Sequence, residues 1–408
     1  MSGDICAYDA ELHFDSAVRH WAEINWGDGG KKEQERLKRS WEVGSTIVGV
    51  VDGAAEALGH WVPGGVRHLD RDVSMAAITA ITTGPLARQH GFASGITARC
   101  LVEAANEGFA TAGLGIFDQG FYDRMGFGMG SYDYLAVFDP AQLTVPVPAR
   151  TPVRLTVDDY EEIHAALHRR FREHGSAVLD PPEIVWAELR LYERPLLLGF
   201  RDGDRLTHFL GMDMKGDYGP HSVNVFSFES RDQYVELLGL LKTLGDQVLA
   251  VRVLQPGGLQ MQDFFDRPFR NAQRTKGGAY AYDISARAFW QLRMLDVAAC
   301  VNETPWRSDP TRFNVEVTDP VVEHLDGSWN GVGGQYIFEA GDVLTAEPGH
   351  DNDAPTLTCS VNALTRWWMG VIPATGLALT PGFEAEPELL QQLDHGLVTP
   401  TPYRGWDF

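Results

Sequence analysis

The sequence predicts an α+β fold in which two mixed-sheet domains stand in tandem and a third α+β domain follows them. Over roughly the first 140 residues, strand-like and helix-like segments succeed one another in the order β-β-β-α-β. After a proline-rich stretch, PAQLTVPVPARTPVRL, a similar order recurs up to about Arg287. Strands such as TRFNVEVTD and a glycine-rich hairpin, WNGVGGQYIFEA, then form a third group.

Residues 1–45 predict helical segments, because they are polar and rich in tryptophan, as in HWAEINW and KKEQERLKRSWEVG. STIVGVVDGAAEALGHWV predicts two strands joined at Asp52-Gly53, a dipeptide that favours a tight hairpin turn. MAAITAITT predicts a further strand, the stretch from His90 to Glu107 a helix, and TAGLGIFD a buried strand. GFYDRMGFGMGSYDYLAVF predicts a turn, a short helix and a strand.

The second unit echoes this order without close identity to the first. We expect helices over DDYEEIHAALHRRFREHG, PPEIVWAELRLYE and RDQYVELLGLLKTLG, and strands over LLLGFRDG, THFLGMDM, HSVNVFSF and QVLAVRVL. The third unit begins at ISARAFWQLRML and ends in a loop-like tail, LVTPTPYRGWDF.

Composition excludes some functions. The chain has 408 residues, a hydrophobic fraction of 44% and a formal net charge of -22. Because this charge repels phosphate backbones, we expect no nucleic-acid partner; it would attract a cationic substrate, and it equally fits a role in solubility. The sequence contains no run of about twenty apolar residues, so we expect no membrane span. The four cysteines are scattered, which favours free thiols in a reducing compartment such as the cytoplasm.

The turn PLARQHGFASG joins a predicted strand to a predicted helix, and its residues suit an anion. A helix N-terminus offers unpaired N–H groups and a partial positive charge. Gly91 lets a ligand approach the backbone, and Arg88 adds charge. Arg88-x-x-Gly91-x-Ala93 therefore predicts a phosphate site, although an ordinary turn with a surface arginine explains the same residues.

A second motif, Gln119-Gly120-Phe121-Tyr122-Asp123-Arg124-Met125-Gly126-Phe127, follows the next strand. Together the two motifs resemble those of the GCN5-related N-acetyltransferases (GNAT). With the third unit and the TPTPYRGWDF tail, the whole chain resembles the Eis (enhanced intracellular survival) family. The resemblance implies a catalytic GNAT domain at 1–146, a degenerate GNAT-like domain at 147–287 and a sterol-carrier-protein-like domain at 288–408.

The resemblance assigns acetyl-coenzyme A to the strand end and the turn. The pantetheine arm would lie against Ile81 and Thr83. The pyrophosphate would lie on six consecutive residues, namely Arg88, Gln89, His90, Gly91, Phe92 and Ala93. Relatives carry a run of arginines where this chain has Arg-Gln-His, which suggests weaker coenzyme binding. The family uses no metal and forms oligomers, typically hexamers.

The catalytic residues are also carried over from the family. Tyr122 matches the general acid, whose ordinary pKa of about 10 keeps it protonated at neutral pH; a core tyrosine would look the same. The terminal carboxylate of Phe408 matches the base, and Asp407 adds a second acid. A disordered tail is the alternative for both residues.

The resemblance implies an amine site walled by the N-terminal helices, which carry Trp21, Glu23, Trp26 and Trp41; aromatic rings and acids there suit a cation. The tryptophans are equally explained as core residues. The sequence thus predicts an acetyl-CoA-dependent N-acetyltransferase for primary amines of cationic small molecules, such as aminoglycosides, polyamines or lysine side chains. Two alternatives remain, a lipid-binding protein that uses its sterol-carrier-like domain and a catalytically weak acetyl-CoA sensor.

Overall fold

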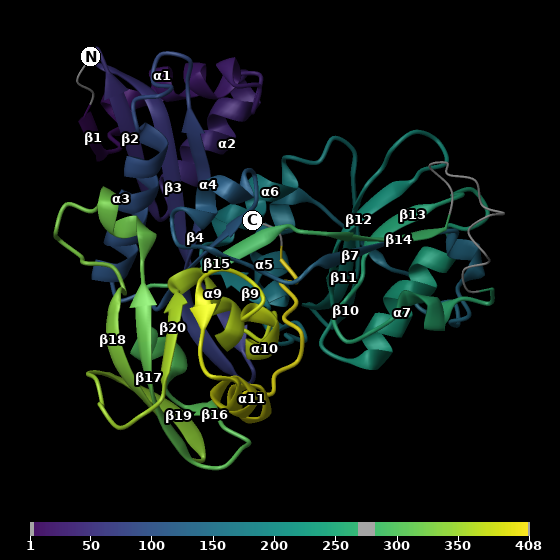
Figure 1. Ribbon diagram of the computed structural model, residues 1–408. Helices are drawn as coiled ribbons and strands as arrows, with labels where there is room; N and C mark the ends of the chain where they lie inside the picture. The colour runs from purple at the N-terminus through teal and green to yellow at the C-terminus, as the bar shows by residue number, and fades with distance from the viewer. Residues whose placement is uncertain (1–3, 268–281, 407–408) are drawn as a thin grey trace. The chain divides into compact units, whose positions relative to one another are not determined.

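A computed structural model describes residues 4–267 and 282–406 of the chain (Figure 1). The chain divides into two compact units that do not follow sequence order. Of the described residues, the first unit holds 4–131, 174–181 and 289–406, and the second holds 132–173, 182–267 and 282–288. The N-terminal and C-terminal parts of the chain therefore fold together, and the predicted boundaries after 146 and 287 stay predictions.

The N-terminal part of the first unit is built on an eight-stranded mixed sheet with the order β1-β2-β3-β4-β5-β15-β6, and β9 pairs with β3 at its side. Its strands are β1 (Asp4–Ala7), β2 (Ser45–Val51), β3 (Ala54–His68), β4 (Arg71–Thr83), β5 (Thr111–Gly115), β6 (Gly128–Met129), β9 (Ala177–Leu179) and β15 (Trp290–Met294). The predicted hairpin between β2 and β3 is confirmed, since Asp52 and Gly53 both have positive φ. The expectation of helices from the first residue was wrong for Asp4–Ala7, whose backbone pairs with Val50–Ile47 of β2.

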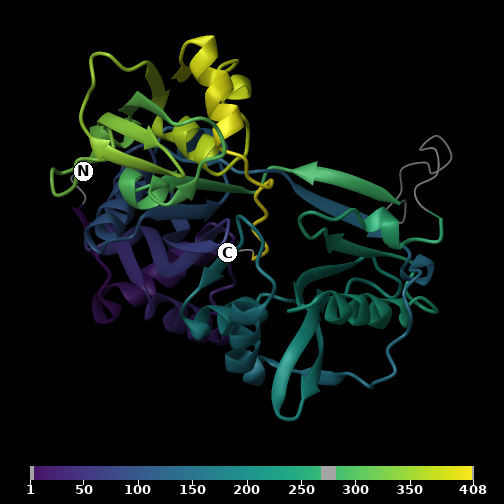
Figure 2. The same ribbon diagram turned by 90° about the horizontal axis from the view of Figure 1, so that it is seen from below.

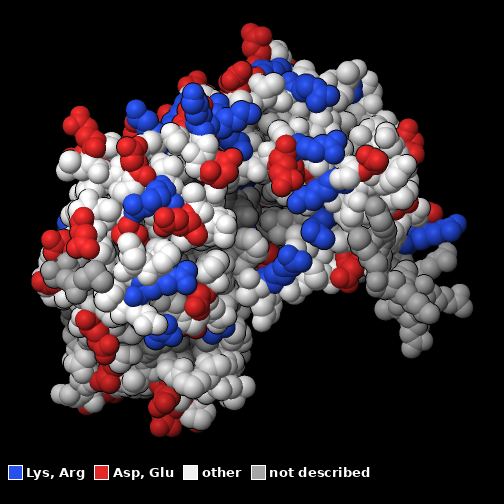
Figure 3. All heavy atoms as spheres, turned by 90° about the horizontal axis from the view of Figure 1, so that it is seen from above, with Lys and Arg blue, Asp and Glu red and all other residues white. Residues whose placement is uncertain are grey.

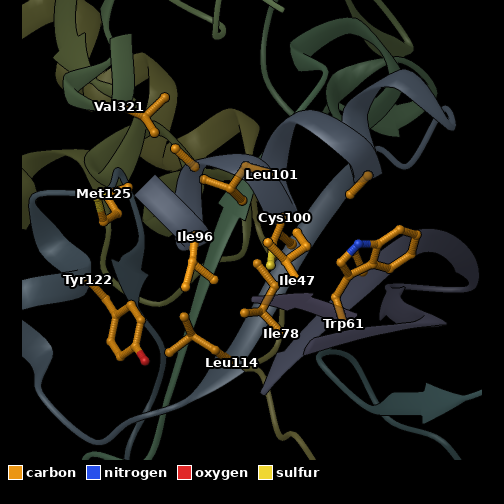
Figure 4. Packing of buried hydrophobic residues seen from close by; sticks show 14 of the residues in the cluster. Ile47, Trp61, Ile78, Ile96, Cys100, Leu101, Leu114, Tyr122, Met125 and Val321 are labelled. Atoms are coloured by element: carbon orange, nitrogen blue, oxygen red, sulfur yellow. The ribbon is translucent and has the colours of Figure 1, made fainter. Parts of the chain in front are cut away.

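Helices cover both faces of this sheet, because alternate strand residues point to opposite sides. Val48 and Leu58 pack against α1 (Ala10–Glu23) and α2 (Lys31–Trp41). Their neighbours Ile47 and Ala57 pack against α3 (Phe92–Asn106) and α4 (Gln119–Asp123), in the cluster that Figure 4 shows. This two-sided burial fixes the positions of the strand ends that matter for the site.

The strand β15 comes from the far end of the chain and completes the N-terminal sheet. Residues Trp290–Met294 run antiparallel to Gly115–Thr111 of β5, and on its other side β15 pairs with β6. The segment ISARAFWQLRML, expected to open the third unit, is thus split. Its first residues form β14 in the second unit, and WQLRM forms β15 in the first.

The C-terminal part of the first unit has its own six-stranded sheet with the order β16-β19-β18-β17-β20-β21. Its elements are β16 (Thr304–Pro305), β17 (Thr311–Thr318), β18 (Gly334–Ala340), β19 (Val343–Pro348), β20 (Thr356–Ser360), β21 (Phe383–Glu384), α8 (Val297–Val301), α9 (Val361–Trp368), α10 (Ala374–Leu377), α11 (Pro387–Gly396) and a 3₁₀ turn at Pro320–His324. Figure 2 shows the tail after α11 running from these helices toward the N-terminal sheet.

The second unit repeats the mixed-sheet plan with the strand order β14-β7-β13-β12-β11-β10-β8. Its elements are β7 (Asp133–Phe138), β8 (Val153–Leu155), β10 (Pro195–Asp202), β11 (Arg205–Asp213), β12 (His221–Ser227), β13 (Val251–Leu254), β14 (Asp283–Arg287), α5 (Tyr160–Arg169), α6 (Pro182–Leu189), α7 (Arg231–Lys242) and 3₁₀ turns at Pro140–Gln142, Val157–Asp159 and Met261–Phe264. The helix α5 ends earlier than predicted, because residues 174–181 leave this unit to form β9 in the first. Among the helices of the described residues, none has the length and hydropathy of a membrane span.

Candidate functional site

The strands β4 and β5 separate at one end. Their parallel pairing covers Met75–Ile78 and Thr111–Leu114 and then stops. The register between β3 and β4 shifts at this level, because β4 carries one extra residue, and Ala80 takes the left-handed φ of 58°. A bulge of this kind bends a strand away from its neighbour. Within the described residues, β4 has no strand partner on its β5 side past Ile78, and this stretch contains Ile81 and Thr83.

The turn that follows β4 presents its backbone amides outward. Gln89 and Gly91 have positive φ values of 65° and 79°, and Gly91 is the N-cap of α3 without any side-chain capping bond. In the part of the chain that the structure describes, none of the backbone amides from Arg88 to Ser94 has an acceptor. Arg88, Gln89 and His90 are exposed, whereas the Phe92 ring is buried in the core. Unpaired amides at a helix N-terminus beside an exposed arginine are suited to an anion.

The corresponding turn of the second unit is built differently. β12 also carries a bulge, and it pairs in parallel with β13 only over His221–Val223. However, the N-terminus of α7 is capped by its own residues, since Ser230 Oγ accepts from the Gln233 amide at 3.4 Å and Gln233 Oε1 accepts from the Glu229 amide at 2.6 Å. The Glu229 carboxylate, paired with Arg205, adds negative charge. These contacts leave this turn less suited to a phosphate than the Arg88 turn.

Tyr122 lies on α4, which begins four residues after β5 and is capped by Asp118 through the Phe121 amide at 3.1 Å. Its ring is 7% exposed and packs edge-on against Phe121 and Phe127. Burial, with smaller contributions from the charges of Cys100 and Asp118, raises the pKa of Tyr122 to about 12. Figure 4 shows its hydroxyl on the side of the ring away from Met125 and Val321. Among the described residues this hydroxyl has no hydrogen-bond partner, so it is available to a ligand.

The C-terminal tail is docked along the first unit. The Tyr403 amide donates to His174 O at 2.7 Å, and the Ala177 amide donates to Arg404 O at 2.8 Å, so the tail runs beside β9. The Arg404 guanidinium lies 4.6 Å from the centre of the Phe289 ring. The carbonyl of Phe289 in turn accepts from the Ile116 amide at 2.9 Å.

This docking places the Arg404 guanidinium over Phe289, whose backbone pairs with Ile116 directly after β5. Asp407 and Phe408 lie outside the described residues. Phe408 is the fourth residue after Arg404, and four residues of extended chain span at most about 14 Å. The docked tail through Trp406, which is 6% exposed, disagrees with the alternative of a disordered tail up to that residue.

The predicted amine wall is only partly exposed. Trp21 is buried among Trp41, Trp26 and the α1 core, and its Nε1 donates to Trp26 O at 3.0 Å, which favours the core interpretation. Glu23 is exposed and lies 3.5 Å from Arg19 in an ion pair. Trp26 is 37% exposed and meets the edge of Phe117, with ring centres 6.0 Å apart.

Sequence reasoning missed two neighbours of these residues. Phe117 is 80% exposed directly after β5, and an aromatic residue at the end of a buried strand was the available signal. His20, fully buried on α1, contacts Thr82 of β4 through Nε2 at 2.8 Å, and burial lowers its pKa to about 4. No spacing in the sequence relates His20 to Thr82, because 62 positions separate them.

Protein families match two parts of the chain. Residues 10–130 match the family described as acetyltransferase (GNAT) domain, and residues 297–405 match the sterol carrier protein domain. The chain therefore carries a GNAT acetyltransferase domain and a C-terminal sterol-carrier-protein domain, and it is an acyltransferase of the GNAT type. GNAT domains use acetyl-CoA as co-substrate, so N-acylation from an acyl-CoA is the general activity of this class.

Solved structures share this arrangement over their full length. Eis1 from Mycobacterium abscessus is 18% identical with a TM-score of 0.76. A GCN5-related N-acetyltransferase from Anabaena variabilis ATCC 29413 is 13% identical with a TM-score of 0.79, and a conserved protein from Enterococcus faecalis V583 is 15% identical with a TM-score of 0.80. In each case 100% of both chains is covered. These structures confirm the predicted fold, which the chain shares with Eis1, while no curated protein sequence matches significantly.

Proposed function

We propose that the chain is an acetyl-CoA-dependent N-acetyltransferase that acts on a primary amine of a cationic small molecule. The single observation that carries the proposal is the uncapped N-terminus of α3. Its unpartnered amides from Arg88 to Ser94 lie directly after the bulged strand β4. A ligand with several anionic oxygens, such as the pyrophosphate of a coenzyme, can accept from several of these donors at once.

The residues present fit acetyl-CoA as co-substrate. The backbone of Ile81 and Thr83, which has no strand partner on the β5 side, would hold the amide-bearing pantetheine arm. The turn from Arg88 to Ala93 would hold the pyrophosphate, mainly through backbone donors. The thioester would then lie at the separated ends of β4 and β5, on the edge where α4 begins.

Tyr122 acts as donor to the departing sulfur in this proposal. Attack by the amine gives a tetrahedral intermediate, its C–S bond breaks, and coenzyme A leaves as a thiolate. With the pKa of Tyr122 near 12 and that of a thiol near 8.5, full proton transfer to sulfur would cost about 5 kcal/mol. The phenol therefore keeps its proton and stabilises the thiolate by a hydrogen bond, and the proton that leaves the amine neutralises the thiolate.

The base of the proposal is the terminal carboxylate of Phe408, with Asp407 beside it. The docked tail supports this, because Arg404 lies over Phe289, which pairs with Ile116 directly after β5. An α-carboxylate has an ordinary pKa of about 3.5, so it orients the ammonium or receives its proton through water rather than in one step.

The substrate class follows from charge and aromatic exposure. Trp26 and Phe117 offer ring faces near the end of β5, and cations bind such faces. The net charge of -22 favours cations over the whole surface, although Lys and Arg are interspersed with Asp and Glu on the face in Figure 3. A homo-oligomer, a hexamer in the Eis family, and a cytoplasmic location complete the proposal.

The test is an activity screen on tag-free protein. Acetyl-CoA is mixed with a panel of aminoglycosides, polyamines and lysine derivatives, and free thiol release is followed. We expect release that depends on the amine. Coenzyme binding, seen as a thermal shift, without release from any amine would support the sensor alternative and contradict the enzyme.

A further inference from the structure

The glycine run Gly126-Phe127-Gly128-Met129-Gly130 lies against residues from the far end of the chain. A Cβ at Gly126 would lie 2.6 Å from Arg293 Nη1, and Gly126 also has a φ of 85°. A Cβ at Gly128 would overlap the backbone oxygen of Asn362, and one at Gly130 would overlap the Trp290 ring. Each of the three glycines thus allows a close approach that a side chain would block.

Polar side chains of the C-terminal part bind the carbonyls that follow α4. Asn362 Nδ2, on α9, donates to Asp123 O at 2.9 Å and to Phe127 O at 2.7 Å. Arg293 Nη1, on β15, donates to Met125 O at 2.5 Å.

Two further contacts involve side chains of β15. Gln291 Nε2 donates to Asp123 Oδ1 at 2.8 Å. Arg293 Nη2 is held by Asp319 Oδ2 at 2.7 Å, and both of these side chains are fully buried. We call Asn362, Gln291 and Arg293 the α4 clamp.

The clamp stabilises the C-terminal end of α4 with contacts from outside the helix. A helix of five residues is too short to be stable alone, and its last carbonyls have no partners within the helix. The Tyr122 carbonyl accepts from the amides of Met125 and Phe127 at 2.9 and 3.1 Å, so these residues also set the end of α4. The clamp binds the carbonyls of both, and thereby fixes the turn that carries the tyrosine.

We propose that Asn362, Gln291 and Arg293 are positioning residues for Tyr122, so that the C-terminal part of the chain builds the active site although none of these three side chains touches a reacting atom. This inference rests on the proposed function, in which Tyr122 donates to the departing sulfur. A misplacement of about 1 Å at a catalytic group costs on the order of 100-fold in rate. The clamp should therefore affect turnover rather than coenzyme binding.

Asn362→Asp tests the proposal, because it replaces the donor by a carboxylate that repels both carbonyls. Asn314→Asp is the matched control. Asn314 lies on β17 of the C-terminal part, and its Nδ2 donates to the backbone oxygens of Asp351 and Ala354 at 2.7 and 3.1 Å, away from α4. Relative to this control, Asn362→Asp should lower kcat 10-fold or more and leave the coenzyme KM within twofold.

Two further measurements make the test specific. In a Tyr122→Phe background, Asn362→Asp should lower kcat no further than Asn314→Asp does, because the hydroxyl that the clamp would position is then absent. Hydrogen exchange of residues 119–130 in the full chain should rise in Asn362→Asp and stay at the wild-type rate in Asn314→Asp. If Asn362→Asp does not fold, Asn362→Ala replaces it, with a smaller effect in the same direction.

Equal kcat and equal exchange in the two variants would overturn the inference. A wild-type protein without amine-dependent activity would overturn the proposed function instead, and the exchange comparison would still decide whether the clamp fixes α4.

Discussion

Gly91→Asp is the sharpest test of the phosphate turn. The carboxylate would accept from the amides near the start of α3, as Ser230 does at the start of α7, and would place a negative charge where the pyrophosphate binds. Two like charges about 5 Å apart repel by about 3 kcal/mol at an effective dielectric constant of 20. We therefore expect coenzyme affinity to fall by more than 100-fold.

Gly53→Asp is the matched control for this change. Gly91 and Gly53 have nearly the same φ, 79° and 83°, and a Cβ at either would meet nothing within 4 Å. Both variants therefore bear the same backbone strain, about 1 kcal/mol, and the same added charge. Steady-state kinetics give the acetyl-CoA KM, and the thermal shift caused by acetyl-CoA reports binding. A coenzyme KM within twofold of the Gly53→Asp value would refute the assignment of the turn.

Three other predictions test the rest of the site. Tyr122→Phe should lower kcat by about 100-fold with little change in coenzyme KM, because it removes one donor to the leaving sulfur; unchanged kcat would remove Tyr122 from that role. A few residues added after Phe408 should abolish activity by moving the carboxylate, and full activity of such a tagged protein would exclude it as the base. Burial lowers the pKa of His20 and His60 to about 4 and that of His68 to about 3, so the unfolded chain, with a histidine pKa near 6.5, binds more protons. Their contribution to stability is complete above about pH 6.5 and is lost as the pH falls toward 4, by about 2 kcal/mol per histidine at pH 5, and an unfolding temperature that is the same at pH 7 and pH 5 would contradict this.

Local patterns predicted the elements and the turn because each depends on neighbours in sequence. The hairpin at Asp52-Gly53 and the start of α3 near Gly91 follow from backbone preferences of single residues. The bulge at Ala80 was not predicted, because a left-handed alanine is set by the packing of β4 against β3 rather than by its own preference.

Long-range features could not be predicted from the sequence for a different reason. The sequence fitted Trp21 equally well to a ligand wall and to the core; its ring is buried, and only the fold decides which face of α1 is buried. The glycines at 126, 128 and 130 carry a regular signal with period two, but the residues that they accommodate lie more than 150 positions away. No local sequence pattern predicts the pairing of β15 with β5 either.

The insertion of β15 has a consequence for how the protein is made. Until Trp290–Met294 leaves the ribosome, about 175 residues after Gly115, one side of β5 remains an open edge with unpaired backbone groups. At roughly 5–20 residues per second, this nascent sheet waits about 10–35 s for its missing strand. A fragment that ends after residue 131 would keep this unpaired edge of β5. We therefore expect the N-terminal part of the first unit to stay monodisperse only when the last third of the chain is synthesised with it or supplied in trans.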